Sequence, residues 1–225
     1  MLLTETSQKT TIPQWQLATW DDYLSHCDDL KKQRVRLFFD GNYLWIDEGL
    51  DGMGAEGINH AKVSDLITAL LFIWFSRFPE PTAESMGRCL LEKPKTQAAA
   101  PDIVLYIGEG VPQWREGEHR RIDLSQWRVP NLVGEIADTT LATDLDEKKK
   151  IYTDLAIPEY WVIDIQGERV FAFQLDSDGK YQQCTESTAL SGLPIDLIEQ
   201  ALQQLKQGTN ISVAHWFNQI GRAHV

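Results

Sequence analysis

The segment from residue 131 to residue 165 constrains the fold more than any other part of the chain. It predicts a strand at 131–138 ("NLVGEIAD"), a helix at 143–156 ("TDLDEKKKIYTDLA") and a strand at 159–165 ("EYWVIDI"). A short helical crossover between two strands places them parallel and adjacent in one sheet. The chain is therefore expected to build a sheet that contains a parallel pair, with a helix packed on it.

The remaining predicted elements enlarge this unit. Asp40, Gly41 and Asn42 favour a tight turn between two strands within 34–47. Further strands are predicted at 101–109 and 168–175, and helices at 59–78, with Asn59 as N-cap, and at 194–205. The helix at 59–78 is apolar on almost every side, so we expect it to be largely buried. The predicted fold class is α/β (α+β), with a central mixed β-sheet flanked by helices.

The length of the chain, 225 residues, favours a single domain with one sizeable core. No internal repeat and no low-complexity linker divides it. We expect an N-terminal extension at 1–30, the folded domain at 31–206 and a C-terminal tail at 207–225.

Cysteine usage and hydropathy predict a cytoplasmic protein. Cys27, Cys89 and Cys184 lie far apart and form no CxxC pair, so neither a zinc site nor a disulfide framework is expected. The first fifteen residues lack the basic start and apolar core of a secretory signal. The longest apolar run, at 66–75, is too short to span a bilayer. We therefore expect no membrane partner.

The net charge of −12 limits how this chain can bind nucleic acid. Non-specific binding draws its affinity from basic surfaces that release counterions from the phosphates. An acidic chain argues against that mode of binding. It leaves room for a metal-dependent enzyme, because bound cations neutralise a carboxylate cluster locally.

Glu135 is an acid within a strand that otherwise has the pattern of a buried one. Alternation along the strand places Glu135 on the same face as Val133 and Ala137. A carboxylate there loses water and needs a cation or hydrogen-bond donors to stay ionised. Two interpretations remain open: a functional acid, or a strand-end acid that reaches solvent or pairs with an arginine.

Asp102 is the second acid of interest. It follows Pro101 and opens the strand "IVLYI". If this strand neighbours the one with Glu135, the two carboxylates meet, and paired carboxylates suit hard divalent cations such as Mg²⁺. A cation held in this way activates a water and stabilises charge on a phosphoryl group. The alternative is an ordinary turn acid, since Pro-Asp is common in turns.

Among the three successive lysines, helix periodicity selects Lys148. It places Lys148 at the edge of the stripe that Ile151 and Tyr152 form, while Lys149 and Lys150 are expected to face solvent. Lys148 could therefore lean over the sheet toward Glu135. The alternative is a lysine that pairs only with Asp144, one turn earlier.

Together these residues resemble a known pattern. The chain is similar to the bacterial family catalogued as putative restriction endonucleases (Uma type), within the PD-(D/E)XK nuclease superfamily. The matching positions are Pro101-Asp102, Glu135, Asp144, Lys148, Tyr152, Glu159-Tyr160-Trp161 and Asp164, with Asn59-His60 before the long helix. The resemblance covers about residues 30–175 and implies a restriction-endonuclease-like mixed sheet flanked by helices.

The resemblance also implies a site and a cofactor. Asp102, Glu135 and the carbonyl of Ile136 would hold Mg²⁺ or Mn²⁺, and Lys148 would orient water or stabilise developing charge. The superfamily lysine two residues after the glutamate is Ala137 here, so the helix lysine would replace it. Glu159 and Asp164 are interpreted as structural. His60 and Tyr152 are possible accessory groups, although a histidine at a helix start more often makes only a structural hydrogen bond.

The implied activity is hydrolysis of phosphodiester bonds in nucleic acid, with DNA as the expected substrate. Candidate phosphate contacts are Arg115, Arg120 and Arg121, with His119 beside them, and Lys31, Lys32, Arg34 and Arg36; ordinary solvated charge is the alternative. A homodimer is expected by analogy, since a two-fold partner suits symmetric cutting of a duplex. Two other functions stay open: a catalytically inactive binding module on the nuclease fold, and a phosphatase-like hydrolase of small phosphates.

Overall fold

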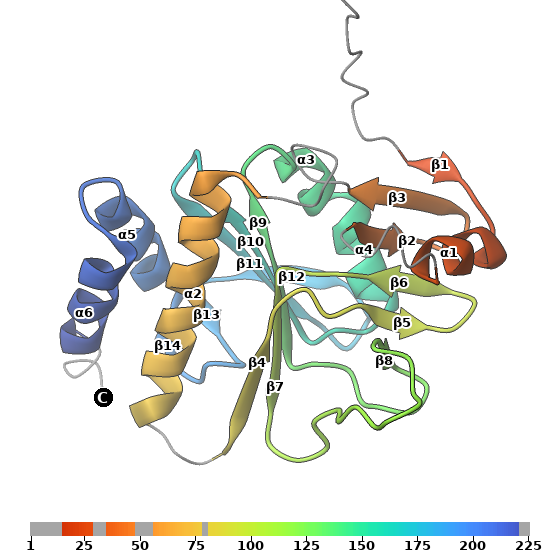
Figure 1. The fold of residues 1–225 in the computed structure, drawn as a ribbon. Coiled ribbons are helices and arrows are strands. Elements are labelled where there is room, and N and C mark those ends of the chain that lie inside the picture. The colour runs from red at the N-terminus through yellow and green to blue at the C-terminus, as the bar shows by residue number, and fades with distance from the viewer. Residues whose placement is uncertain (1–14, 29–34, 48–55, 78–80, 221–225) are drawn as a thin grey trace, which may run out of the picture.

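The structure is a computed structural model and describes residues 15–28, 35–47, 56–77 and 81–220. Figure 1 shows a central sheet seen nearly edge-on, with helices on one side and a second sheet with further helices on the other. Among the described residues, the helices are α1 (Trp20–Cys27), α2 (Ile58–Arg77), α3 (Leu141–Leu145), α4 (Glu147–Asp154), α5 (Ile195–Leu205) and α6 (Asn210–Ile220). The mixed α+β class expected from the sequence is confirmed.

The central sheet has six strands. Their order is β12 (Tyr181–Cys184), β11 (Arg169–Leu175), β10 (Glu159–Asp164), β9 (Leu132–Ala137), β7 (Ile103–Ile107) and β4 (Ala83–Met86). β9 and β10 are parallel, with Glu135 opposite Val162, and the other pairs are antiparallel. The parallel pair predicted from the strand–helix–strand segment is therefore confirmed, and so is the adjacency of the strands that carry Asp102 and Glu135.

The second sheet also has six strands. Their order is β1 (Gln16–Leu17), β3 (Tyr43–Asp47), β2 (Arg36–Phe39), β6 (Gln97–Ala99), β5 (Leu91–Lys93) and β8 (Ile122–Asp123). The predicted hairpin between β2 and β3 is confirmed, and Gly41 at its turn has a φ of +103°, which glycine adopts without steric cost. A short pair, β13 (Glu186–Ser187) and β14 (Leu193–Pro194), completes the sheets of the described residues.

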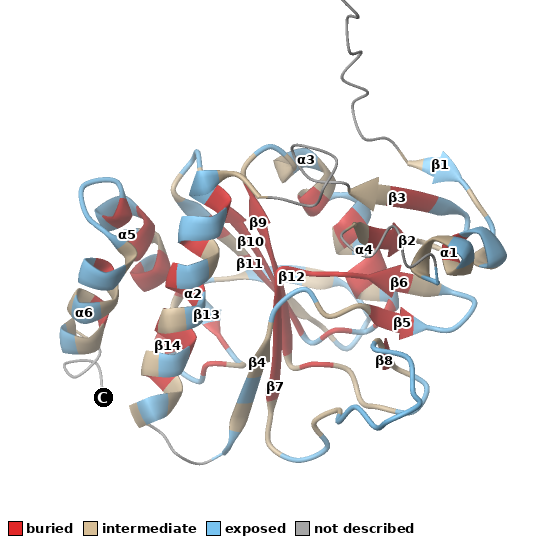
Figure 2. Ribbon diagram, in the orientation of Figure 1, coloured by how far each residue is buried: buried red, intermediate tan, exposed pale blue. Residues whose placement is uncertain are grey.

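Side-chain alternation in the central strands feeds two separate cores. Leu132 and Ile136 of β9 face the core shared with α2, α5 and α6. Val133 and Ala137 face the opposite core, which α4 and the second sheet complete. Figure 2 shows that the central strands are buried along most of their length. Glu135 shares the face of Val133 and Ala137, as predicted, and therefore lies between the two sheets.

Two helix details differ from the sequence-based expectations. The helix expected at 143–156 is divided into α3 and α4 at Asp146, which has non-helical φ and ψ of −118° and −84°. The Asp144 carbonyl accepts a hydrogen bond from the Tyr160 hydroxyl at 2.8 Å, which draws this turn away from regular helix. Asn59 is not an N-cap, because α2 already begins at Ile58 and the Gly57 carbonyl accepts the first helical bond.

Helix α2 is less buried than its composition predicted. One face packs into the core, whereas Phe72 on the other face is 64% exposed. By length and composition α2 could cross a membrane, but core helices of globular domains pass the same test. The segment expected as a tail contains α6, which packs on α2: Phe217 is fully buried, and Arg77 donates to its carbonyl at 2.9 Å.

Candidate active site

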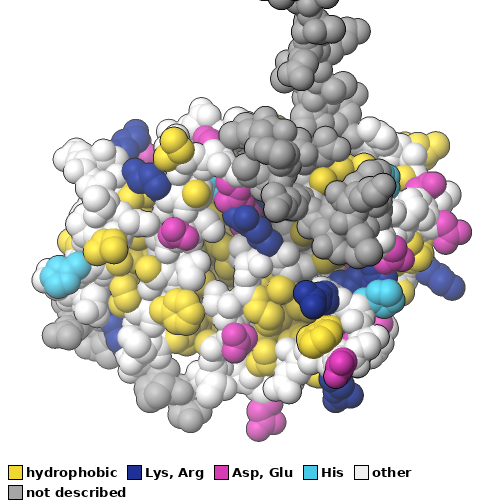
Figure 3. Space-filling view, viewed as in Figure 1, with side chains coloured by type: hydrophobic (Ala, Val, Ile, Leu, Met, Phe, Trp, Pro, Cys, Tyr) yellow, Lys and Arg dark blue, Asp and Glu magenta, His cyan; other side chains and the backbone are white. Residues whose placement is uncertain are grey.

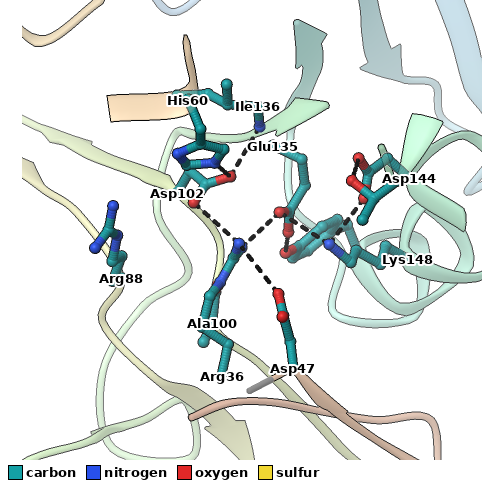
Figure 4. Close-up of polar contacts among 12 residues, drawn as sticks. Arg36, Asp47, His60, Arg88, Ala100, Asp102, Glu135, Ile136, Asp144 and Lys148 are labelled. Atoms are coloured by element: carbon teal, nitrogen blue, oxygen red, sulfur yellow. Dashed lines mark hydrogen bonds and ion pairs between the residues drawn. The ribbon is translucent and has the colours of Figure 1, made fainter. Parts of the chain in front are cut away.

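A group of charged side chains, buried at its centre and partly exposed at its rim, extends from the space between the two sheets to the start of α2 (Figure 4). Its acids are Asp47, Glu56, Asp102, Glu135 and Asp144, and its bases are Arg36, His60, Arg88 and Lys148. Asp102 and Glu135 are 4% and 1% exposed. Buried charges require partners, and every member of this group has one.

Glu135 lies at the centre of the group. Its Oε2 is 2.7 Å from Nη2 of Arg36 and 3.1 Å from Nζ of Lys148, and its Oε1 accepts a hydrogen bond from the Tyr152 hydroxyl. Burial and the neighbouring Glu135 carboxylate raise the pKa of Tyr152 well above its ordinary value. The phenol therefore stays protonated and donates a hydrogen bond to Glu135. The solvent-exposed alternative for Glu135 is therefore wrong, while pairing with an arginine is confirmed together with pairing to Lys148.

Asp102 lies beside Glu135 because β7 stops pairing with β9 at Ile103, opposite Gly134. The freed amide of Ile136 donates to Oδ2 of Asp102 at 2.8 Å, so the carboxylate replaces a strand partner. Oδ1 lies 3.1 Å from Nη1 of Arg36. Burial raises the pKa of Asp102, but Arg36 and His60 outweigh it and hold the pKa below its usual value.

Lys148 joins Glu135 to Asp144. Its ammonium is 2.8 Å from Oδ1 of Asp144 and 4.2 Å from the centre of the Phe38 ring, and the residue is 2% exposed. Burial lowers its pKa, but the two carboxylates outweigh burial and raise it, so Lys148 is a cation at neutral pH. Lys148 therefore contacts Glu135 and Asp144 at once, and the alternative in which it pairs only with Asp144 is wrong.

The other two lysines of the triplet lie outside this group. Lys150 is exposed, as expected. Lys149 is half-buried instead, with its ammonium 3.6 Å from the centre of the Phe173 ring, and burial lowers its pKa. The expectation of a fully solvated Lys149 is wrong, because the aromatic face of β11 lies beneath its aliphatic stem.

His60 and Glu56 extend the group at the start of α2. Nε2 of His60 lies 3.3 Å from Oδ2 of Asp102, and Nδ1 lies 2.8 Å from Oε2 of Glu56. Burial lowers the pKa of His60, but its bonds to Asp102 and Glu56 outweigh burial and raise it to about 9. Arg88 pairs with the other oxygen of Glu56 from the rim of the site, where its side chain is 44% exposed.

The donor atoms fit a divalent cation. One ligand atom each from Glu56, His60 and Asp102 lie within 4.8 Å of one another. Carboxylate oxygens suit Mg²⁺ and Mn²⁺, and an added imidazole favours Mn²⁺ over Mg²⁺. The His60 proton would leave on metal binding, since a ligating imidazole is neutral. The set predicted from the sequence (Asp102, Glu135 and the Ile136 carbonyl) shares Asp102 with this one.

Arg36, Glu56 and Asp47 were not identified as members of the site from the sequence. Arg36 was noted only as a possible phosphate contact, and its companions Lys31, Lys32 and Arg34 lie outside the described residues. The one local signal is the four-residue spacing of Glu56, which precedes α2, and His60 in its first turn, because side chains at this spacing can meet.

The arginines predicted as phosphate contacts lie in the segment between β7 and β9. Arg115 and Arg120 are exposed, and Arg120 lies over the Trp114 ring with its guanidinium carbon 5.5 Å from the ring centre. Arg121 pairs with Glu92 at 3.0 Å and with Asp28 at 3.2 Å. Arg121 directly precedes β8, the edge strand of the second sheet, and two strands, β5 and β6, separate β8 from β2, which carries Arg36.

Glu159 and Asp164 of β10 have structural partners, in agreement with their predicted role. Glu159 accepts from the indole of Trp161 at 2.7 Å and from the amides of Thr188 and Ala189 at 2.9 and 2.8 Å. Asp164 accepts from the Gly167 amide at 2.9 Å and pairs with Arg169. These carboxylates anchor the segments that follow β13 and β10.

Glu159→Gln is expected to lower the free energy of unfolding by about 1.5–3 kcal/mol. Glutamine keeps one acceptor oxygen, so its NH2 group would face either the Trp161 indole or the two backbone amides. Mn²⁺ affinity is expected to remain that of the unmodified chain. Urea denaturation and calorimetric titration measure the two quantities. Weakened Mn²⁺ binding at unchanged stability would contradict the structural role.

The mixed central sheet with helices on one side and a second sheet on the other defines the chain as a protein of the restriction-endonuclease-like nuclease fold. A solved structure, described as a putative nuclease belonging to DUF820 from Anabaena variabilis ATCC 29413, matches with a TM-score of 0.53 and 16% sequence identity, over 82% of this chain and 99% of that chain. The model of the family described as "Putative restriction endonuclease" (Uma2) matches residues 20–209. The chain belongs to this family. A comparison with curated proteins gives no match.

Proposed function

We propose that the chain is an endonuclease that hydrolyses phosphodiester bonds in nucleic acid with Mg²⁺ or Mn²⁺ as cofactor, and that DNA is its substrate. Family membership and fold support a nuclease function. The observation that carries the proposal is the pair of buried acids, Asp102 and Glu135, with a buried lysine beside them. Buried charge without a purely structural reason is concentrated at functional sites.

The roles follow from the contacts. A bound cation would lower the pKa of a coordinated water and neutralise charge on the scissile phosphate. Asp102 and Glu135 would hold it, while Glu56 and His60 form a second possible donor set with Asp102. Burial raises the pKa of Glu135, and Lys148 and Arg36 oppose this rise. Lys148 also orients the carboxylate and adds positive charge beside the reacting centre. Arg88 extends from the rim and is placed to contact a phosphate.

The charge distribution favours attraction of nucleic acid by cations bound at the site rather than by the protein surface as a whole. Figure 3 shows the described Lys and Arg side chains of the face seen in Figure 1 distributed among acidic, apolar and neutral ones, with no one large basic patch. With a net charge of −12, the chain depends on bound cations to bring a polyanion to the acids. We further propose that it acts in the cytoplasm and as a homodimer, whose two sites would cut the two strands of a duplex.

The test compares two buried glutamates in the cleavage of plasmid and linear DNA. Glu135→Gln is expected to remove Mn²⁺-dependent cleavage, whereas Glu159→Gln is expected to cleave as the unmodified chain does below its melting temperature. Full cleavage by Glu135→Gln would refute the assignment. Metal binding without cleavage of DNA or RNA would favour the inactive binding module, and turnover of free nucleotides alone would favour a phosphatase.

A further inference from the structure

All four carboxylate oxygens of the paired acids already contact donors. Oδ2 of Asp102 accepts the Ile136 amide, and Oδ1 faces Arg36 at 3.1 Å. Oε1 of Glu135 accepts from Tyr152, and Oε2 faces both Lys148 and Arg36. A carboxylate oxygen can accept a second contact, so a cation need not displace the Ile136 amide or Tyr152. A cation that binds both acids would, however, lie against the positive charge of Arg36 and repel it.

Arg36 is the donor that can leave. The amide of Ile136 is fixed in β9, and Tyr152 and Lys148 are 0% and 2% exposed on the inner face of α4. The Arg36 side chain is 18% exposed and comes from β2 of the second sheet. It is also long and flexible, so its charged head can move into water while its stem stays in place.

The guanidinium lies where a bridging cation would lie. Figure 4 shows it between Asp102 and Glu135, with Asp47 on its outer side at 3.8 Å. Its Nε and Nη2 also donate to the Ala100 carbonyl at 3.0 and 2.9 Å. Removing this charge leaves Lys148 beside Glu135 and His60 beside Asp102, but it removes the cation that lies between the two carboxylates. Their mutual repulsion then grows, and a bound cation would relieve it.

We propose that Arg36 and the divalent cation are alternative occupants of the space between Asp102 and Glu135, so that metal binding displaces the guanidinium toward the rim. The inference rests on the proposed function in taking these two acids as metal ligands. Arg36 is then an internal competitor that keeps the acids paired without metal and sets the metal concentration at which the site fills. Competition of this kind is reciprocal: the tighter Arg36 binds, the weaker the metal binds.

The test is calorimetric titration of Mn²⁺ into the full chain and into Arg36→Met. The methionine keeps the apolar stem and removes the charge. Mn²⁺ is expected to bind Arg36→Met about 5–150-fold more tightly than the unmodified chain, the range of typical coupling between sites. The rise in melting temperature caused by Mn²⁺ is expected to be larger in the variant as well.

Arg128→Met is the matched control. Arg128 donates to the carbonyls of Ile107 and Glu109, at the opposite end of β7 from Asp102. Its removal costs stability and is expected to leave Mn²⁺ affinity unchanged. Equal tightening in both variants would overturn the proposal, because it would reflect general loosening of the fold.

The proposal can also be tested if Arg36→Met does not fold without metal. If Arg36→Met folds only with Mn²⁺, the proposal is supported, because the metal then replaces the missing charge. If it stays unfolded at saturating Mn²⁺, Arg36→Lys is decisive: one ammonium cannot bridge both acids as the guanidinium does, so tighter Mn²⁺ binding is expected, and unchanged or weaker binding overturns the proposal. Tighter binding with no cleavage of any polymer would refute the nuclease function and leave the exchange standing.

Discussion

Asp102→Asn is expected to lose Mn²⁺-dependent cleavage and to weaken Mn²⁺ binding more than about 100-fold, beyond the 10–100-fold typical of residues that only support a ligand. The reason is the position of this carboxylate. Oδ1 faces the space shared with Glu135, and Oδ2 faces His60, so Asp102 belongs to both possible donor sets. Asparagine keeps the size and one oxygen for the Ile136 amide, but it removes the charge that a divalent cation requires.

Asp164→Asn provides the matched control. Asp164 is 4% exposed, as Asp102 is, but its partners are the Gly167 amide and Arg169 at the end of β10. Its replacement is expected to cost about 1–3 kcal/mol of stability and no Mn²⁺ affinity. If both variants lose Mn²⁺ binding in proportion to their loss of stability, Asp102 is not a ligand.

The second large effect is expected at Lys148. Lys148→Gln is expected to lower the single-turnover rate of DNA cleavage by about 10²–10³-fold, the usual cost of removing one preorganised electrostatic contact. Glutamine cannot supply the charge that now lies between Glu135 and Asp144, so Glu135 loses a partner that opposes the rise of its pKa and orients it. Mn²⁺ binding is expected to persist, because the oxygens of Asp102 and Glu135 remain.

Lys150→Gln separates this effect from a general loss of positive charge. Lys150 lies on the same helix, α4, and is exposed, so its variant is expected to cleave at the unmodified rate. A Lys148→Gln protein that remains folded and cleaves as fast as Lys150→Gln would show that Lys148 serves only to neutralise buried acids.

The parallel pairing of β9 and β10 could be predicted because the relevant signals are local. The crossover from β9 to β10 is short, and one rule of chain geometry places the two strands parallel. The same short range explains why the contact between Lys148 and Glu135 could be anticipated: the residues are 13 positions apart, across that crossover. Helix periodicity and strand alternation then aim both side chains at the same core.

The role of Arg36 could not be predicted for the opposite reason. Its partner Glu135 is 99 positions away and belongs to another sheet, and no local pattern reports how two sheets face each other. The break between α3 and α4 was missed for a similar reason. It involves the hydroxyl of Tyr160, a side chain from β10 that helix propensities do not include.

The most direct test of the central claim is the dependence of DNA cleavage on Mn²⁺ concentration after complete removal of metal by a chelator. The site predicts no cleavage in the metal-free protein and a rate that rises and saturates as Mn²⁺ is added. It also predicts that half-saturation falls at the Kd found by calorimetry for the same protein. Cleavage that persists without metal, or none at Mn²⁺ concentrations far above that Kd, would contradict the account.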